Sequence, residues 1–168
     1  MKKIQKLLVA NRGEIALRII RTAREMGLST VAVYEKPDSE AYFLRFADQA
    51  ILIGDGPRRD YLNIDKIITA AQKAGADAIH PGYGFLSENP DLAQACVDAG
   101  ITFIGPPPRV IRDLGNKVVA RDIMKKASIP FIPGTGTLSA GDAGLSEAVA
   151  FGKTHGYPIM LKALAGGG

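Results

Sequence analysis

Residues 6–34 read KLLVANRGEIALRIIRTAREMGLSTVAVY, and this stretch decides the fold class. The apolar run at residues 6–10 predicts a short buried strand, and the spacing of apolar residues from Ile15 to Met26 predicts a helix. Gly27 suits the left-handed residue that ends many helices, and a strand rich in β-branched residues resumes at residues 30–34. The repeating unit is therefore strand, helix, glycine, strand.

The same unit recurs along the chain. On the predicted first helix, one apolar face is shared by Ile15, Ile19, Ala23 and Met26. Later units comprise helix 64–74, Gly75 and strand 78–80; helix 91–99, Gly100 and strand 102–104; and a helix ending near His155, Gly156 and strand 159–162, with a further strand at 51–53. Strands that alternate with helices predict an α/β fold, a parallel sheet with helices on both faces. Ligands of such sheets bind beyond the carboxyl ends of the strands.

A domain boundary is predicted after the proline run at residues 106–108, because proline cannot continue a central strand. A short helix at 109–114 follows, and Asn116 is a good N-cap for a helix over 117–127. We expect residues 1–113 to form the first domain and residues 114–168 to begin a second, incomplete one.

Composition and charge disfavour several classes of protein. The net charge of +4 is scattered, which disfavours a nucleic-acid or membrane-surface protein, and no apolar run reaches transmembrane length. The expected compartment is the cytosol or an organelle matrix. Cys96 is the single cysteine and is expected to be a buried, inert thiol, while His80 and His155 are too isolated to predict a metal site.

Two loops that follow strands could carry chemistry. In the loop 80–90, HPGYGFLSENP, Tyr83 and the backbone amides could face a ligand; alternatively Tyr83 packs, and Asn89 or Asp91 caps the next helix. The turn at residues 11–14 has one glycine, not the three of a dinucleotide fingerprint. Capping and a surface role for its charged residues explain much of this turn.

Glu35, at the end of the second strand, resembles the ribose-binding acid of dinucleotide folds, but without the glycines this signal is weak. At the other end of the chain, Lys162 precedes the glycines at 166–168. A lysine in an apolar strand is costly unless it has a partner, which favours a phosphate-binding role. Lys117 by itself would be an ordinary surface lysine.

Taken together, these segments resemble the biotin carboxylase component of biotin-dependent carboxylases. The matching runs are residues 10–18, 80–89, 103–106, 115–117 and 157–168. The resemblance implies a Rossmann-like N-terminal domain followed by the start of an ATP-grasp domain. It also implies an enzyme that uses ATP, Mg²⁺ and bicarbonate to carboxylate biotin on a carrier protein through carboxyphosphate.

The resemblance assigns roles to individual residues. Lys117 and Lys162 match lysines that bind the ATP phosphates, and Gly166, Gly167 and Gly168 match the start of the lid over them. Tyr83 and Gly84 match the biotin side of the site, and Arg21 and Glu25 match positions near a dimer contact. The implied partners are a biotin carboxyl carrier protein, a carboxyltransferase component and a second copy of the chain.

The match is loose over residues 35–59, and Leu164 stands where the family more often has a small or polar residue. The family's catalytic and metal-binding residues lie downstream, so we expect the 168-residue chain to be inactive alone. A nicotinamide-dependent oxidoreductase is disfavoured by the missing glycine fingerprint. A non-catalytic α/β binding or regulatory module remains the alternative.

Overall fold

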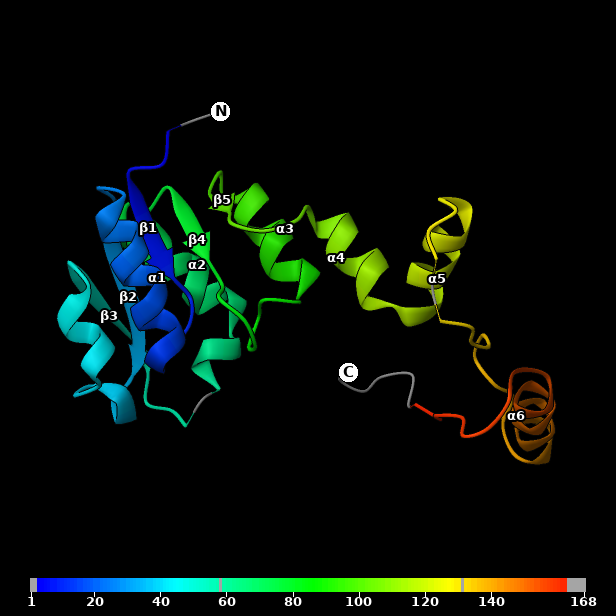
Figure 1. Cartoon of the computed structure of the whole chain (residues 1–168). Coiled ribbons are helices and arrows are strands. Elements are labelled where there is room, and N and C mark those ends of the chain that lie inside the picture. The colour runs from blue at the N-terminus through cyan, green and yellow to red at the C-terminus, as the bar shows by residue number, and fades with distance from the viewer. Residues whose placement is uncertain (1–2, 58, 131, 163–168) are drawn as a thin grey trace. The chain divides into compact units, whose positions relative to one another are not determined.

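A computed structural model describes residues 3–57, 59–130 and 132–162. The chain divides into two compact units, Met1–Arg112 and Asp113–Gly168, which are treated separately below (Figure 1). Among the described residues, no helix is both long and apolar enough to cross a membrane.

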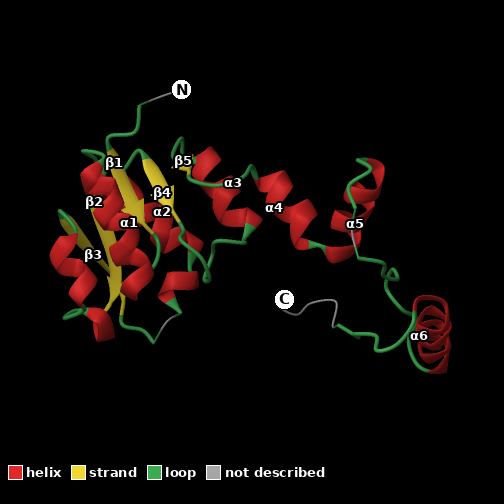
Figure 2. Ribbon diagram, viewed as in Figure 1, coloured by secondary structure: helices red, strands yellow, loops and turns green. Residues whose placement is uncertain are grey.

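The first unit is built on one sheet of five parallel strands (Figure 2). In sequence order these are β1 (Lys6–Val9), β2 (Ser29–Glu35), β3 (Gln49–Gly54), β4 (Ala78–His80) and β5 (Thr102–Phe103). Their order across the sheet is β3-β2-β1-β4-β5, and each neighbouring pair is parallel. The predicted parallel α/β sheet is confirmed.

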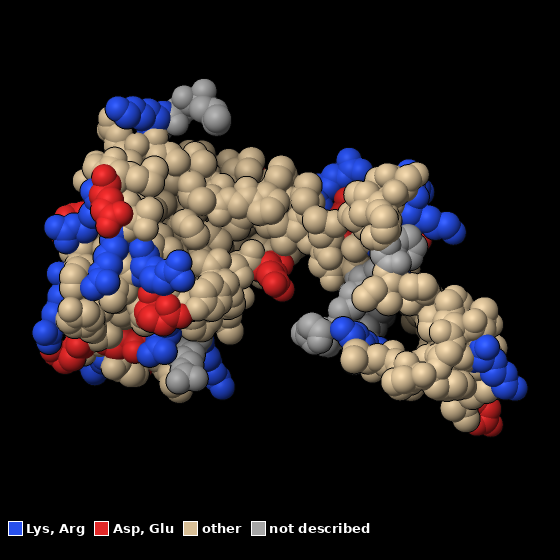
Figure 3. Space-filling model, viewed as in Figure 1, with Lys and Arg blue, Asp and Glu red and all other residues tan. Residues whose placement is uncertain are grey.

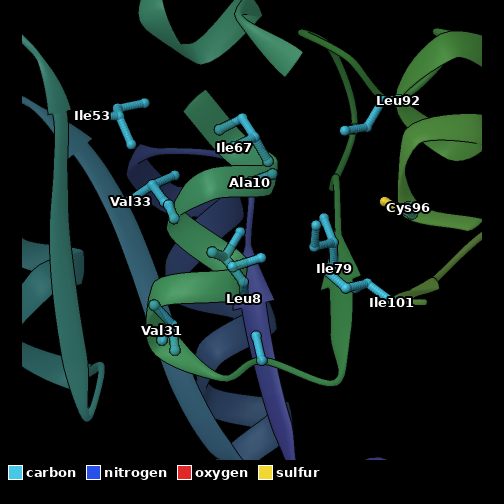
Figure 4. Close-up of a cluster of buried hydrophobic side chains, with 14 of the residues drawn as sticks. Leu8, Ala10, Val31, Val33, Ile53, Ile67, Ile79, Leu92, Cys96 and Ile101 are labelled. Carbon is cyan, nitrogen blue, oxygen red and sulfur yellow. The ribbon is translucent and has the colours of Figure 1, made fainter. Parts of the chain in front are cut away.

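Helices cover both faces of this sheet, as the sequence predicts. They are α1 (Gly13–Glu25), α2 (Ile64–Ala74) and α3 (Pro90–Asp98), with 3-10 turns η1 (Lys36–Asp38), η2 (Tyr42–Phe46) and η3 (Asp60–Leu62). Alternate residues of each strand point to opposite faces. Leu8, Val31 and Ile79 therefore pack with α2 and α3 (Figure 4), whereas Leu7, Val9 and Ala32 pack with α1 and Phe43.

Local signals explain why several elements have the predicted bounds. The α2 helix and strand β4 begin and end at the predicted residues. The Asn63 side chain accepts a hydrogen bond from the Lys66 amide at the start of α2, and Gly75 ends that helix with a φ of 64°. Both are short-range effects, so the bounds of this helix can be predicted from the sequence alone.

The predicted face of α1 is wrong in part. The helix buries Ala16, Ile20 and Ala23, whereas Met26 is 70% exposed. Residues 15 and 19 and residues 16 and 20 form adjacent apolar stripes on the same helix, only 100° apart. Close packing on the sheet selects the stripe that carries the small Ala16.

The second unit is helical over its described part. Helix α4 (Pro108–Gly115) crosses the division between the units, followed by α5 (Lys117–Lys126) and α6 (Asp142–His155). The Asn116 side chain accepts hydrogen bonds from the Val118 and Val119 amides, which confirms it as the N-cap.

The strand predicted at residues 159–162 is absent from the structure. A strand requires a hydrogen-bonded neighbour, since its backbone groups cannot pair within the segment. All five described strands lie between residues 6 and 103, in the first unit, so the described part of the second unit offers residues 159–162 no strand to join.

Candidate functional site

The candidate site lies where β1 and β4 end side by side in the first unit. The chain runs from β1 outward to β2 and β3 on one side, and then returns to place β4 on the other side of β1. This reversal of strand order is a topological switch point, at which open α/β sheets bind ligands beyond the carboxyl ends of the strands. The turn after β1 and the loop after β4 meet there.

Asn11 joins these two segments. Its side chain is fully buried, and its Nδ2 donates to the backbone oxygens of Pro81 at 2.7 Å and Tyr83 at 2.9 Å. Its Oδ1 accepts from the Arg12 amide at 2.9 Å. Both donor hydrogens of the amide are used, so Asn11 fixes the loop 80–89 against the start of α1. The sequence interpretation of residues 11–14 as a turn with capping and surface roles missed this bridge.

The backbone of the loop 80–89 turns sharply through residues of positive φ. Gly82 and Gly84 have φ of 67° and 72°, and Phe85 has φ of 43°, which is uncommon for a residue with a side chain. A Cβ on Gly82 would lie 2.7 Å from Ile15 Cγ2 and 2.8 Å from Asn11 Nδ2. At Gly84 nothing lies within 4 Å of such a Cβ. Gly82 is therefore needed for packing, while Gly84 leaves open space beside the backbone.

Tyr83 points out of the loop instead of packing into the core. It is 60% exposed, and its hydroxyl donates to Glu14 Oε1. This hydrogen bond is the first cause of the raised pKa of Tyr83. Asn89 caps α3 by accepting from the Asp91 amide at 2.8 Å. The two interpretations of this loop thus each describe one part of it: an exposed tyrosine at its tip and a structural cap at its end.

His80 lies at the base of the loop as a neutral acceptor. Its Nδ1 accepts from the Gly82 amide at 3.0 Å, and burial lowers its pKa. An apolar groove of about 520 Å³ begins here and follows α1; its lining includes His80, Gly82, Tyr83, Ile15, Arg18 and Ile19. The groove is large enough for a small ring system beside the loop.

A charged network fixes the other side of the loop. Asp38 pairs with Arg12, whose Nε donates to Asp38 Oδ2 at 2.6 Å, and the Tyr61 hydroxyl donates to the same oxygen at 2.8 Å. The Tyr61 ring is buried and stacks on Phe85, with 5.2 Å between ring centroids. Burial, followed by the bond to Asp38, raises the pKa of Tyr61, so the phenol stays protonated and donates.

This network also corrects the view of Arg12 as a surface residue. The hydrogen bond to Asp38 is the first cause of the raised pKa of Arg12. No local spacing predicts the network, because its members at positions 12, 38 and 61 are more than 20 positions apart in sequence. The one available signal was Asp38 itself, an acid shortly after a buried strand.

Glu35 has a structural role in the described residues. It is 2% exposed, and its Oε1 accepts from the Asp60 amide at 2.7 Å and from the Tyr61 amide at 3.3 Å. The carboxylate thereby fixes η3 to the end of β2. This arrangement favours a structural role for Glu35, which holds the backbone at Tyr61, over the ribose-binding role.

The predicted phosphate-binding residues lie in the second unit. Lys117 is the first residue of α5, and Lys162 is exposed in a segment without strand structure. Gly166, Gly167 and Gly168 lie outside the described residues. Tyr83 and Gly84 are therefore the only predicted ligand-site residues that the structure brings together within its described part.

The two predicted dimer-contact residues are both exposed on α1. Arg21 lies over the Phe46 ring at 5.2 Å from its centroid, and Glu25 is the last residue of the helix. On the face shown in Figure 3, Lys and Arg side chains of the first unit are interspersed with Asp and Glu, with no continuous basic stripe. A contact through this helix would therefore combine charges of both signs.

Two sequence expectations concern reactive side chains. Cys96 is buried on α3, and burial raises the pKa of its thiol to about 11, so the predicted buried thiol is confirmed. Among the residues that the structure describes, no three His, Cys, Asp or Glu side chains form a group that could hold a metal ion. At the switch point the structure brings together the exposed Tyr83 and the backbone of the loop 80–89.

Known proteins resemble the chain over its whole length. Residues 3–111 match the family described as "Biotin carboxylase, N-terminal domain", and residues 116–168 match the family "Carbamoyl-phosphate synthase L chain, ATP binding domain". A biotin carboxylase of Halalkalibacterium halodurans is 51% identical over 165 residues, covering 98% of this chain and 36% of that protein.

Two solved structures are similar to this chain in both sequence and fold. A biotin carboxylase–β-γ-ATP complex from Campylobacter jejuni is 46% identical with a TM-score of 0.90, over 99% of this chain and 37% of that one. The biotin carboxylase domain dimer of Hydrogenobacter thermophilus 2-oxoglutarate carboxylase, in complex with MgADP, ADP and bicarbonate, is 46% identical with a TM-score of 0.89; the match covers 100% of this chain and 36% of that one. The chain thus spans little more than a third of the length of these relatives. With 109 of its residues, 3–111, matching one family and its sheet matching the same fold, this chain belongs to the biotin carboxylase N-terminal domain family.

Proposed function

We propose that this chain is the N-terminal part of a biotin carboxylase that uses ATP and bicarbonate to carboxylate biotin on a carrier protein. The observation that carries the proposal is the loop at the switch point, where Tyr83 is 60% exposed and the backbone beside Gly84 is open. The matched relatives support it, because they include a biotin carboxylase–β-γ-ATP complex and a biotin carboxylase domain in complex with MgADP and bicarbonate.

Tyr83 and Gly84 are proposed to line the biotin side of the site. An exposed aromatic ring can pack against a small apolar ring system, and the absence of a side chain at Gly84 lets a ligand approach the backbone. Asn11 contributes by holding the carbonyl of Tyr83, which limits the movement of the loop. These residues orient the substrate and do not themselves exchange protons with it.

Lys117 and Lys162 are proposed to bind the phosphates of ATP, with Gly166, Gly167 and Gly168 beginning the lid above them. A lysine supplies a positive charge to phosphate, and each charge-assisted hydrogen bond contributes about 1.5–3 kcal/mol. Mg²⁺ would neutralise phosphate charge in the complete enzyme. The described residues of this chain offer no acidic cluster for that ion, so it would be held by residues of the complete enzyme outside this part.

The proposed partners are a biotin carboxyl carrier protein, a carboxyltransferase component and a second copy of the enzyme. For the dimer contact we propose Arg21 and Glu25, which are exposed on α1. One of the solved relatives is described as a domain dimer, which supports this part of the proposal.

A chimera tests the proposed reaction. Residues 1–168 would replace the matched segment of the Halalkalibacterium halodurans biotin carboxylase, with that enzyme unchanged as the control. We expect ATP hydrolysis that depends on both bicarbonate and free biotin. A folded chimera that binds neither nucleotide nor biotin would overturn the proposal and favour the non-catalytic α/β module.

Lysine variants of the chimera test the nucleotide side. Lys117→Ala and Lys162→Ala should each lower kcat/KM for ATP by about tenfold or more, because each removes a charge-assisted contact. Lys153→Ala is the matched control, since Lys153 is exposed in the last turn of α6. Equal losses in all three variants would show that net charge, not a phosphate site, governs the effect.

A further inference from the structure

The loop 80–89 contains a backbone conformation that needs external support. Phe85 adopts a φ of 43°, directly after Gly84 and two residues after Tyr83. For a residue with a side chain this region is unfavourable, and it persists where the surroundings over-determine it. The position of Phe85 sets the path of the backbone that presents the exposed Tyr83.

The support for Phe85 comes from Tyr61. Their rings stack with 5.2 Å between centroids and an interplanar angle of 24°, and Phe85 packs against the core cluster of which Tyr61 is a member. Tyr61 belongs to η3, a different segment from the loop, so this contact restrains the loop from outside. Offset stacked rings attract one another beyond the effect of area burial.

Tyr61 is itself held at several points. Its hydroxyl donates to Asp38 Oδ2 at 2.8 Å, and its amide donates to Glu35 Oε1 at 3.3 Å. Asp38 is in turn paired with Arg12, which lies next to Asn11 at the start of α1. A ring that is 1% exposed and fixed at both its hydroxyl and its backbone has little freedom to follow movements of Phe85.

We propose that Tyr61 is a positioning residue for the site: anchored on Asp38, it stacks on Phe85 and holds the backbone that presents Tyr83 and Gly84. This inference rests on the proposed function in so far as the loop forms the biotin side of the site. Asn11 fixes the loop through Pro81 and Tyr83, and Tyr61 fixes it through Phe85. The loop is therefore restrained on both sides of Gly84.

Amide hydrogen exchange in the 168-residue chain tests the positioning directly. The probes are two amides that bond within the loop, Ser87 to the Gly84 oxygen at 2.9 Å and Asn89 to the Leu86 oxygen at 3.0 Å. Tyr61→Leu should speed their exchange about 3- to 10-fold, which corresponds to losing one stacked pair. Tyr61→Phe keeps the ring and should preserve most of the protection.

The matched control is Phe43→Leu. Phe43 is 2% exposed in the core cluster on the opposite face of the sheet, so its loss destabilises the unit without touching the loop. Faster exchange of the Ser87 and Asn89 amides in Phe43→Leu, equal to that in Tyr61→Leu at the same loss of overall stability, would overturn the inference.

A double-mutant cycle makes the test independent of any single variant. If Tyr61 acts through Phe85, the combination of Tyr61→Leu and Phe85→Leu should speed exchange no more than either change alone. Additive effects of the two changes would refute the coupling. If Tyr61→Leu fails to fold, Phe85→Leu replaces it, and unchanged loop protection in that variant refutes the proposal.

The chimera separates this inference from the proposed function. There, Tyr61→Leu should raise KM for free biotin about 3- to 10-fold and leave KM for ATP unchanged. Faster exchange without any change in KM for biotin would uphold the positioning and refute the biotin-side assignment of the loop. Unchanged exchange would refute the positioning whatever the kinetics show.

Discussion

Asn11→Ala is the substitution with the most clearly defined expected cost. It removes hydrogen bonds of 2.7 and 2.9 Å from a side chain with no exposed surface. Each bond contributes about 0.5–1.5 kcal/mol, and the buried Pro81 oxygen left without its donor adds about 1–3 kcal/mol. The Tyr83 oxygen is partly exposed and can be hydrated instead. The sum predicts a loss of about 2–6 kcal/mol in the free energy of unfolding.

Urea unfolding of the 168-residue chain, followed by far-ultraviolet circular dichroism, measures this loss. With an m-value of about 2 kcal/mol/M, the midpoint should fall by about 1–3 M while m stays constant. Asn63→Ala is the matched control: Asn63 is exposed and caps α2 through the Lys66 amide, so its loss should cost only about 1 kcal/mol. If Asn11→Ala costs no more than Asn63→Ala, the bridge to the loop does not stabilise the unit.

The isosteric change Asn11→Asp should make the stability of the chain depend on pH in a direction that can be measured. In an ionised carboxylate, the oxygen that replaces Nδ2 would face the Pro81 and Tyr83 oxygens without a hydrogen to donate. This repulsion, together with burial, raises the pKa of the introduced acid in the folded state. Its neutral form is then favoured by folding, so the variant should regain stability as pH falls and lose it as pH rises through the raised pKa. A variant that loses stability on acidification faster than the unchanged chain would refute this account.

Three further predictions concern the loop and its histidine. Burial lowers the pKa of His80, so its contribution to stability is present above about pH 6.5 and is lost as pH falls through the folded-state pKa. His80→Gln should therefore flatten the decrease in urea midpoint between pH 8 and pH 5. An unaltered decrease would show that His80 is not its cause. Gly82→Ala should destabilise the unit by about 2–4 kcal/mol in the same assay, because its Cβ meets atoms at 2.7 and 2.8 Å in addition to the unfavourable φ. Gly84→Ala, with open space around its Cβ, should cost only about 1–2 kcal/mol, and equal costs for the two changes would mean that crowding at Gly82 relaxes freely.

Elements that depend on local interactions can be predicted from the amino-acid sequence. The bounds of α2 and β4 were predicted to the residue, since Asn63, Gly75 and the apolar spacing act within one or two turns. The parallel sheet followed from the alternation of strands and helices, because parallel neighbours need crossover connections. The exposed Tyr83 and the cap at Asn89 were both within reach as alternatives for one loop.

Features that depend on partners distant in sequence could not be predicted and are set by the fold. Packing on the sheet determines which of the two adjacent apolar stripes of α1 is buried, because the stripe that carries the small Ala16 fits closest to the strands. Residues 159–162 do not form the predicted strand, because a strand needs a hydrogen-bonded neighbour that the local sequence cannot supply. The fold also brings Arg12, Asp38 and Tyr61 together, since their attraction acts only after the sheet has placed the ends of β1 and β2 side by side.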